Sequence, residues 1–562
     1  MTAPDAVVSS GHMVDTGDRP TPRFPPDQVA RVTAEVRRVF GRWGVGPGTT
    51  VVCGGARGAD IIVAEAGVAH GAKVILCLAL PPDDFEATSV ALAGSDWSAR
   101  FRALLAVSEV RILEDGAAPH GDDGDVFART NEWMVGVATA LAGGRPHAVI
   151  VWDGGRGDGT GGTEDFVGRL GYGGPHETVA VIDPTPRRYE ARQAPAPRKR
   201  VLALDGGGIR GVLSLEILGA IERGLRRLYG EELVLGDWFD YIGGTSTGAI
   251  IAAGLAMGMP VAALVEHYRS VGRKSFSRSF VPRRALYQDA PLRRELEEVF
   301  GKETTLGDAG LRSLLLVVLH NTGTDSAWPL SNCTQAKYNR ADRYLLPKPD
   351  RNLDVSLTEL LRGSTAAPVF FPPQKITVGK NDFVFQDGGI TPFNNPALLL
   401  FLMATLPEYG LGWEVGEDKL LVVSVGTGAA PAVHEKLLAR QVGFLFNAKN
   451  LTSVFMNGAS VGQDLLCRTI GGCRFGDPLD REVGDRLNLT GLAGSNLFSY
   501  VRYNASLADG DLEDAGYADA RTRRRIRKLD GVKAVPELQA IGAAVGGKVD
   551  VPAHFEGFLD GP

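Results

Sequence analysis

Apolar positions in the first 180 residues change their spacing several times. They recur at helical intervals over Val29–Trp43 and again over Ile61–His70, which predicts two amphipathic or buried helices. Short apolar runs bounded by Gly, Asp and Pro predict strands at Thr50–Cys53, Lys73–Leu78, Ala148–Trp152 and Val179–Ile182. Strands that alternate with helices predict an α/β layered domain.

A second alternating region follows. Its predicted strands are Val201–Leu204, Phe239–Ile242, Leu314–Leu319, Phe383–Phe385 and Leu420–Val425. Between the first two strands, Val212–Tyr229 has a helical apolar stripe formed by Leu218, Ile221, Leu225 and Leu228. The second region is therefore also predicted to be an α/β layered sheet, and it is the larger of the two.

The segments between these regions set the expected domain boundaries. Residues 1–26 lack apolar periodicity and predict a disordered leader, and the Pro- and Arg-rich stretch 185–198 predicts a linker. We expect a first domain over 27–184, a second over 199–530, and a C-terminal tail over 531–562.

Composition and charge restrict the function. The 562 residues carry a net charge of −6, which argues against a general nucleic-acid binder because phosphate contacts need clustered Lys and Arg. The five cysteines are scattered without a CxxC pair, so we expect neither disulfides nor a metal site, and a reducing, cytoplasmic location. The sequence contains no stretch of eighteen or more uncharged apolar residues, so we expect no membrane-spanning helix.

Two serines, Ser246 and Ser460, stand in a G-x-S-x-G pattern, which a chain with 72 glycines produces easily by chance. A nucleophile elbow also needs a strand before the serine and a helix after it. Ser246 follows the strand Phe239–Ile242 and precedes an apolar run from Ala249, whereas Ser460 lies inside a helix-like stretch. We predict Ser246 as the nucleophile, with Gly244 and Gly248 allowing the strand and helix to approach closely.

The motif DGGGIRG at 205–211 permits two interpretations. Gly206, Gly208 and Gly211 match a dinucleotide fingerprint between a strand and a helix, for which Glu231, Glu232 or Asp237 could bind a ribose. Alternatively, consecutive glycine amides near a nucleophile form an oxyanion hole. The serine elbow about forty residues later favours the oxyanion hole.

A nucleophilic serine needs a base. His434 and His554 come late enough for a Ser–acid–His order, but neither lies in a motif-like setting. Asp387 ends a predicted strand and is followed by Gly388 and Gly389, which let the chain turn away. Since an ordinary Asp has a pKa near 3.9, it must act by direct contact, with partial burial raising its basicity.

The blocks DGGGIRG, GTSTG and QDGG, in this order, resemble the signature of the patatin-like phospholipases. Gly363–Pro373, Asn394–Pro396 and Val422–Gly428 resemble the same family, so the match spans 205–428. The resemblance implies a Ser246–Asp387 dyad without histidine that hydrolyses acyl esters of lipids. It implies an oxyanion hole in the loop Gly206–Gly208, with donors at Gly207 and Gly208 and with Arg210 bracing the loop. One departure is that Ile390–Phe393 separates DGG from NNP.

The first domain, through CGGARGAD and GTGGTEDF, resembles Rossmann-like nucleotide-sensing domains related to the LOG proteins and to DprA. This resemblance implies a nucleotide site formed by Gly54, Gly55, Arg57, Asp60, Gly162, Thr163 and Glu164. The alternative is that both glycine stretches are ordinary turns of an α/β domain.

The sequence thus predicts a patatin-like α/β/α layered domain preceded by a smaller Rossmann-like α/β domain. Its expected activity is lipid acyl hydrolysis at a membrane surface, without metal or cofactor. Two other hypotheses stay open: a nucleotide-responsive effector that degrades membranes, and a non-enzymatic dinucleotide-binding module. The basic run Arg521–Lys528 is either a contact for anionic headgroups or a solvated helix face.

Overall fold

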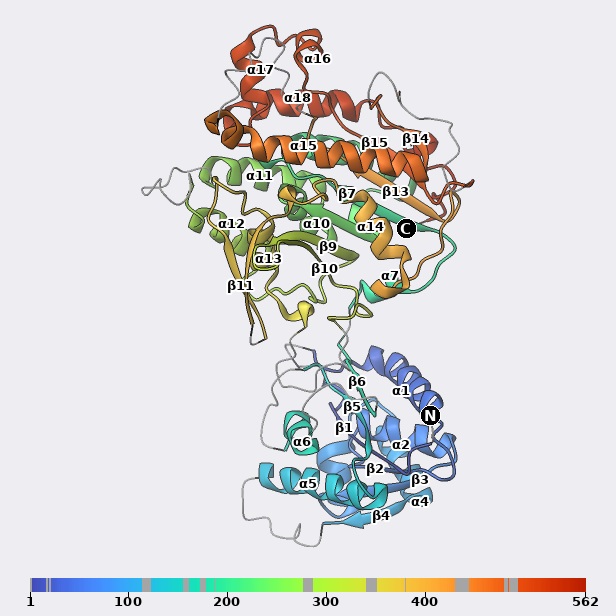
Figure 1. The fold of residues 1–562 in the computed structure, drawn as a ribbon. Coiled ribbons are helices and arrows are strands. Elements are labelled where there is room, and N and C mark those ends of the chain that lie inside the picture. Colours follow the sequence, from blue (N-terminus) through green and yellow to red (C-terminus); the bar gives the residue numbers. More distant parts are fainter. Residues whose placement is uncertain are drawn as a thin grey trace. The chain divides into compact units, whose positions relative to one another are not determined.

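A computed structural model of the chain separates into two compact units, Met1–Pro186 and Arg187–Asn339 with Asn352–Pro562. The structure describes residues 3–16, 19, 22–113, 123–154, 161–171, 178–185, 187–275, 287–339, 351–379, 381–429, 444–479, 484 and 494–561. Each unit has its own sheet (Figure 1). Within the described residues no helix is both long and apolar enough to cross a membrane.

The first unit is a six-stranded, fully parallel sheet in the order β4-β3-β2-β1-β5-β6. Its strands are β1 Ala6–Gly11, β2 Thr50–Cys53, β3 Lys73–Leu78, β4 Glu109–Ile112, β5 His147–Val151 and β6 Val179–Ile182. Its helices are α1 Val29–Trp43, α2 Ala59–Ala69, α3 Pro82–Phe85, α4 Trp97–Val107, α5 Asp123–Ala142 and α6 Thr163–Leu170. The chain reverses its winding direction between β1 and β5, as in doubly wound folds.

Alternation along the strands divides the core of this unit into two layers. Val7 of β1 packs with α1 and α2, whereas Val8 packs with Met134 of α5 and Phe166 of α6. Both valines are fully buried. The prediction of a disordered leader over 1–26 was therefore wrong, because Ala6–Gly11 pairs on both edges as a central strand.

The second unit has a nine-stranded mixed sheet in the order β11-β12-β9-β8-β7-β13-β15-β14, with β10 paired to β9. Its strands are β7 Lys199–Leu204, β8 Tyr241–Thr245, β9 Leu314–Asn321, β10 Ser326–Ser331, β11 Gln374–Val378, β12 Asn381–Asp387, β13 Leu420–Val425, β14 Gly472–Phe475 and β15 Ser499–Tyr503. The strands from β14 to β9 run parallel, and β10, β11 and β12 pair antiparallel.

Helices cover both faces of this sheet. They are α7 Glu190–Gln193, α8 Gly211–Tyr229, α9 Leu235–Trp238, α10 Thr247–Ala256, α11 Val261–Ser275, α12 Ala290–Phe300, α13 Leu357–Ser364, α14 Ala397–Thr405, α15 Phe444–Ile470, α16 Asp509–Asp514, α17 Ala520–Ile526, α18 Val535–Gly546 and α19 Val551–His554. Gly243 of β8 faces Leu400 of α14, whereas its neighbour Gly244 faces α10. Since successive strand residues point to opposite faces, α10 and α14 lie on opposite sides of the sheet.

Three expectations about the second unit need correction. The predicted linker 185–198 contains α7, and Tyr189 beside it is fully buried in the core. The predicted tail 531–562 contains α18, which packs so closely on α8 that a side chain at Gly542 would meet the carbonyl oxygen of Leu213. In the predicted apolar stripe of α8, Leu218, Ile221 and Leu225 are buried. Leu228, in the last turn of the helix, is 48% exposed.

Candidate active site

Ser246 stands at the sharp turn between β8 and α10, with φ 54° and ψ −123°. A positive φ is a strained conformation for serine, and such strain concentrates at functional sites. A side chain at Gly244 would meet the carbonyl oxygen of Gly248 at 2.1 Å, and one at Gly248 would meet that of Leu204 at 2.3 Å. Only glycine on both sides therefore lets strand and helix approach closely enough to form this turn.

Ser364, at the end of α13, fixes the backbone of the turn. The Ser246 N–H donates to Ser364 Oγ at 2.9 Å, and Ser364 in turn donates to the carbonyl oxygen of Val318 at 2.7 Å. The sequence motif Gly363–Pro373 contains this serine, but no role had been predicted for it.

Asp387 reaches the turn because of the register of β12. On β9, β8 pairs up to Val318, and β10 occupies the opposite edge along Leu316–Asn321. The segment of β12 that pairs with Leu319–Asn321 must therefore take the edge that β8 has just left. This places Asp387, opposite Leu319, next to the residue that follows β8.

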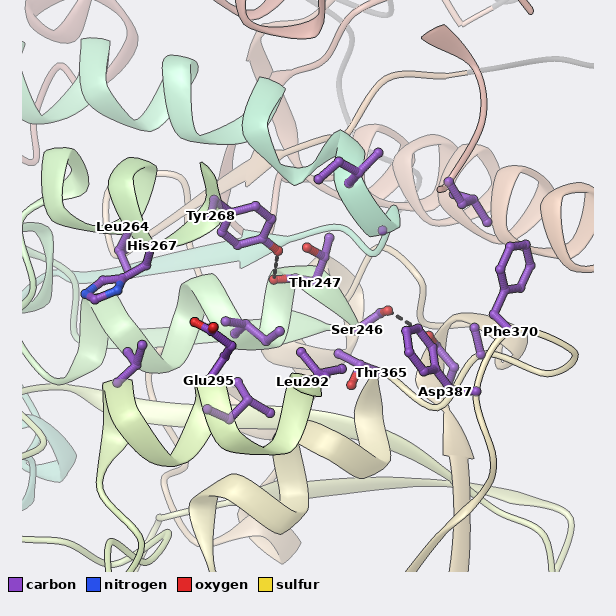
Figure 2. Close-up of a pocket in the computed structure, with 18 of the residues that line it drawn as sticks. Ser246, Thr247, Leu264, His267, Tyr268, Leu292, Glu295, Thr365, Phe370 and Asp387 are labelled. Carbon is purple, nitrogen blue, oxygen red and sulfur yellow. Dashed lines mark hydrogen bonds between the residues drawn. The ribbon is translucent and has the colours of Figure 1, made fainter. Parts of the chain in front are cut away.

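The two side chains are in direct contact (Figure 2). Ser246 Oγ donates to Asp387 Oδ2 at 2.7 Å, and the Gly389 N–H donates to Asp387 Oδ1 at 2.7 Å. Burial raises the pKa of Asp387 to about 6, although these two hydrogen bonds and the charge of Arg362 act in the opposite direction. A carboxylate of this basicity can accept the serine proton near neutral pH.

Of the two late histidines, only His554 lies within the described residues, and its ring contacts a partner other than Ser246. His554 is hydrogen-bonded through Nδ1 to the Tyr503 hydroxyl, and His434 lies outside the described residues. His267 lines the pocket described below, but the structure shows no hydrogen bond between it and Ser246.

Arg362 is a fully buried cation near the dyad that was not predicted from the sequence. Its Nη2 donates to the carbonyl oxygen of Pro372 at 3.0 Å, and burial lowers its pKa to about 10. Since its charge lowers the pKa of Asp387, it limits how far burial raises the basicity of the carboxylate.

The glycine loop follows β7 and lies beside Ser246. The N–H groups of Gly207 and Gly208 have no acceptor within the described part of the chain, so both are available to an oxyanion. The Gly206 N–H is not available, because it donates to the carbonyl oxygen of Asn394 at 3.0 Å. Arg210 braces the loop by donating to the carbonyl oxygens of Gly207 and Gly428, at 3.4 and 3.1 Å.

The contacts of this loop weigh against a dinucleotide at the same position. A side chain at Gly208 would lie 2.4 Å from the carbonyl oxygen of Leu529, and one at Gly207 would lie 2.2 Å from Thr427 Oγ1. Leu529 and Thr427 thus lie against the α-carbons of the loop and leave less space around it than a pyrophosphate with its two nucleosides needs. Asp237, one of the proposed ribose ligands, pairs with Arg312 at 2.7 Å instead.

A buried polar network holds the start of the loop. Arg502 of β15 binds both carboxylate oxygens of Asp205, at 2.8 and 2.7 Å, and also donates to Ser424. Ser460, in the middle of α15, accepts from Asn394 Nδ2 at 2.9 Å. The second G-x-S-x-G serine therefore supports the site through Asn394 and does not lie at a strand–helix turn.

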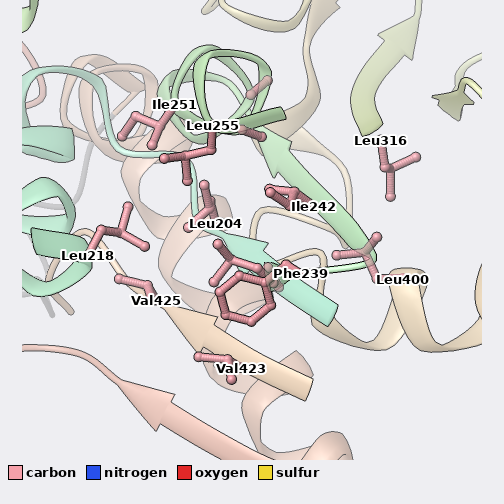
Figure 3. Close-up of a cluster of buried hydrophobic side chains, with 14 of the residues drawn as sticks. Leu204, Leu218, Phe239, Ile242, Ile251, Leu255, Leu316, Leu400, Val423 and Val425 are labelled. Atoms are coloured by element: carbon pink, nitrogen blue, oxygen red, sulfur yellow. The ribbon is translucent and has the colours of Figure 1, made fainter. Parts of the chain in front are cut away.

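The core beneath the elbow is continuous across the central strands (Figure 3). Ile242 of β8 and Leu204 of β7 lie on the face of the sheet covered by Ile251 and Leu255 of α10, whereas Leu316 of β9, which pairs with Gly243, lies on the α14 face. All five side chains are almost or completely inaccessible to solvent. This packing fixes β8 relative to α10 and therefore fixes the direction of the serine.

An apolar pocket of about 990 Å³, open solvent at its mouth included, extends from the dyad. Ser246 and Asp387 lie at one end beside Phe370, and His267 and Glu295 lie toward the other end (Figure 2). Between them the wall is formed by the apolar face of α12, with Leu292, Leu296, Val299 and Phe300. Such a pocket suits a long apolar group attached to a reactive carbonyl.

The predicted nucleotide residues lie at the carboxyl ends of strands in the first unit. Asp60 is buried in the first turn of α2, and its Oδ2 accepts from the Ala56 N–H at 3.2 Å, which links it to the Gly54–Gly55 loop. Burial raises the pKa of Asp60 to about 7. Arg57 donates to the carbonyl oxygen of Val14 at 3.1 Å.

The remaining residues of that prediction lie at the start of α6. Gly162 is its N-cap, Thr163 is buried, and Glu164 lies in its first turn. Asn131 of α5 donates to the carbonyl oxygens of Gly161 and Gly162, at 2.8 and 3.3 Å.

Comparison with known proteins assigns the family. Residues 202–401 match the model of the patatin-like phospholipases. These residues are a patatin-like phospholipase domain.

Among curated relatives, patatin-like protein 1 of Arabidopsis thaliana is 31% identical, over 41% of this chain and 58% of that protein. The cGAMP-activated phospholipases of Escherichia coli and Vibrio cholerae are 30% and 29% identical, over 41% and 38% of this chain and 62% and 59% of theirs. The matches thus span less than two thirds of these relatives.

The buried Asp205–Arg502 ion pair predicts a measurable effect on the stability of the second unit. Arg502→Met should lower the free energy of unfolding by about 3–5 kcal/mol, because it leaves the Asp205 carboxylate buried without its partner. Urea unfolding followed by circular dichroism measures the loss. The double variant with Asp205→Asn should recover most of it, and an equal loss in the single and double variants would show that the charge is not the cause.

Proposed function

We propose that this protein hydrolyses acyl esters of lipids through a Ser246–Asp387 dyad. The observation that carries the proposal is the 2.7 Å hydrogen bond between the two side chains, at one end of an apolar pocket. The strained backbone of Ser246 supports it, since the conformation directs the hydroxyl away from the strand–helix turn.

In the first step, Ser246 Oγ attacks the ester carbonyl while its proton passes to Asp387 Oδ2. The negative charge that develops on the carbonyl oxygen accepts hydrogen bonds from the Gly207 and Gly208 amides. The N-terminus of α10, which begins at Thr247, adds a favourable dipole. Collapse of the tetrahedral intermediate breaks the ester bond, and Asp387 returns the proton to the departing alcohol.

In the second step, water attacks the acyl-serine. Asp387 accepts a proton from the water, and the fatty acid leaves as the serine oxygen recovers that proton. The same carboxylate thus serves as base and acid in both halves of the reaction, so a histidine is not required. The acyl chain stays in the apolar pocket throughout.

The substrate class follows from the pocket wall and from the relatives. The wall is mostly aliphatic and aromatic, which favours a fatty acyl chain over a short polar acid. The relatives from Escherichia coli and Vibrio cholerae are named as phospholipases, which supports a phospholipid as the ester.

The dyad can be tested by replacing each of the two G-x-S-x-G serines, Ser246 and Ser460, and comparing the activity of the variants. Ser246→Ala and Asp387→Asn should each lower kcat for fatty-acid release from phospholipid vesicles by about 10³-fold or more, because the nucleophile or its base is lost. Ser460→Ala, which lacks the hydrogen bonds of that hydroxyl to Asn394 and Asp205 but leaves the dyad intact, should retain activity within about tenfold. Full release by either dyad variant would contradict the proposal.

The raised pKa of Asp387 predicts the pH dependence of the reaction. Since only the ionised carboxylate can accept the serine proton, kcat/KM for a water-soluble ester should rise from pH 5 to 7, with half its maximum near pH 6. A stopped-assay series in constant ionic strength, with circular dichroism at each pH to verify folding, measures the profile. A profile that is flat or falls over this range would exclude Asp387 as the base.

A second proposal concerns the first unit, which we suggest binds a nucleotide that regulates hydrolysis. Doubly wound sheets bind ligands at the point where the strand order reverses, here beyond β1 and β5. Asp60 Oδ1 is buried and has no hydrogen-bond partner within the described residues, so it can accept from a ligand hydroxyl or amino group. Two relatives are named as cGAMP-activated.

Calorimetry of the full chain with cyclic dinucleotides and mononucleotides tests this second proposal. One ligand should bind and stimulate lipid release, and Asp60→Ala should weaken its binding by about tenfold or more while hydrolysis of a soluble ester without ligand is unchanged. Arg38→Ala, at an exposed position of α1, serves as control. No binding by any nucleotide would remove the regulatory role and leave the hydrolase proposal intact.

A further inference from the structure

Three segments of the second unit meet at the dyad end of the pocket. Phe370 lies beside Asp387, the Met456 methyl group packs near Gly389, and the Leu529 carbonyl covers Gly208 (Figure 2). Each of these lining residues has an exposed neighbour in the chain, namely Val369, Phe455 and Lys528. The chemistry of the surface next to the pocket is therefore set by these three segments.

The first two segments expose apolar side chains. Phe455 of α15 is 54% exposed and Val454 55%. Val369 is 62% exposed and has a φ of 73°, which is unusual for a β-branched residue. Its strained backbone thus holds an apolar side chain in solvent beside the pocket.

The exposed apolar surface continues along α15. Its members are Val454, Phe455, Val461, Leu465 and Leu466. Positions 454, 458, 461 and 465 are three or four residues apart, which places them on one helical face. Gly458 and Gly462 lie on the same face, and a side chain at either would meet nothing within 4 Å. No charged residue interrupts this face between 454 and 466, so it forms a contiguous patch of the kind that marks an interaction site.

The third segment adds positive charge. Arg523, Arg525 and Arg527 pair with carboxylates of their own region, Asp509 and Glu537. The side chains of Arg521, Arg524 and Lys528 are exposed and form no ion pair with the described residues. The basic run thus contains a paired half, which is structural, and an exposed half, which leads toward Leu529 at the pocket.

We infer that these exposed groups form the surface by which the domain lies on a bilayer that contains anionic lipids. We call them the rim: Val369, Val454, Phe455, Val461, Leu465, Leu466, Arg521, Arg524 and Lys528. Apolar side chains next to exposed cations are the composition of interfacial membrane contacts. The inference rests on the proposed lipid hydrolysis, since the rim adjoins the end of the pocket at which an ester would enter.

Co-sedimentation of the full chain with phosphatidylcholine vesicles, with and without phosphatidylglycerol, tests the rim. Wild type should bind the anionic vesicles more tightly. Val454→Gln with Phe455→Gln should weaken that binding about tenfold or more, and Arg521→Gln, Arg524→Gln and Lys528→Gln together should do the same and remove the preference for phosphatidylglycerol.

Matched controls lie near the far end of α8, about 25 Å along the helix from the glycine loop. Leu228→Gln and Arg227→Gln change an exposed apolar and an exposed basic residue there and should leave vesicle binding unchanged. Hydrolysis of a water-soluble short-chain ester should stay at the wild-type rate in every rim variant. This assay also shows whether the substitutions have disturbed the fold.

The outcomes are distinguishable. Unchanged vesicle binding by both rim variants would overturn the inference. A halved sedimentation mass on replacing Val454 and Phe455, with vesicle binding retained, would identify the α15 face as a contact between two copies of the chain and would also overturn it. Normal vesicle binding by a wild type that cleaves no ester would contradict the proposed hydrolysis and leave the rim in place.

Discussion

The turn at Ser246 leaves no room for a side chain at residues 244 and 248, two positions before and two after the serine. The carbonyl oxygens of Gly248 and Leu204 occupy the positions where the β-carbons of residues 244 and 248 would lie. The β7–β8 pairing, the direction of α10 and the course of the glycine loop all depend on this close approach. The strain at Ser246 persists because the buried core around Ile242, Ile251 and Leu255 fixes the strand and the helix on both sides of it.

Charge burial is the second feature that shapes the site. Desolvation raises the pKa of Asp387 to about 6, and its hydrogen bonds with Ser246 and Gly389, together with the charge of Arg362, limit that rise. A buried charge is costly unless it is paired, and the structure pairs Asp205 with Arg502 from a distant strand. The glycine loop therefore begins at a fixed point beside Ser246.

The two units contain different kinds of candidate site. The second unit contains the proposed dyad, the apolar pocket and the inferred rim, a combination that suits contact with lipid. The first unit offers a parallel sheet with a topological switch point and a buried, half-satisfied carboxylate at Asp60. These two features are the basis of the proposed nucleotide site.

The sequence by itself determined the local elements and the chemistry of the motifs. Helical periodicity over Val29–Trp43 and the apolar runs of β2, β3 and β13 predicted those elements closely, because a buried face must repeat with the period of its own backbone. The sequence did not predict the segments whose folded structure depends on contacts with distant strands and helices. Ala6–Gly11 is a strand only because β2 and β5 flank it, and residues after 531 are ordered only because α8 receives α18.

Only the tertiary structure decided which residues surround the predicted dyad. Asp387 contacts Ser246 because β10 occupies one edge of β9, so β12 must pair with the other edge. No local sequence pattern indicates which edge a strand will take. Arg502, Ser364 and Arg362 contact the site from distant strands and helices, so their roles have no signature in the residues next to them. The local sequence determines the chemistry that a side chain offers. Long-range strand and helix pairing determines which other side chains it contacts.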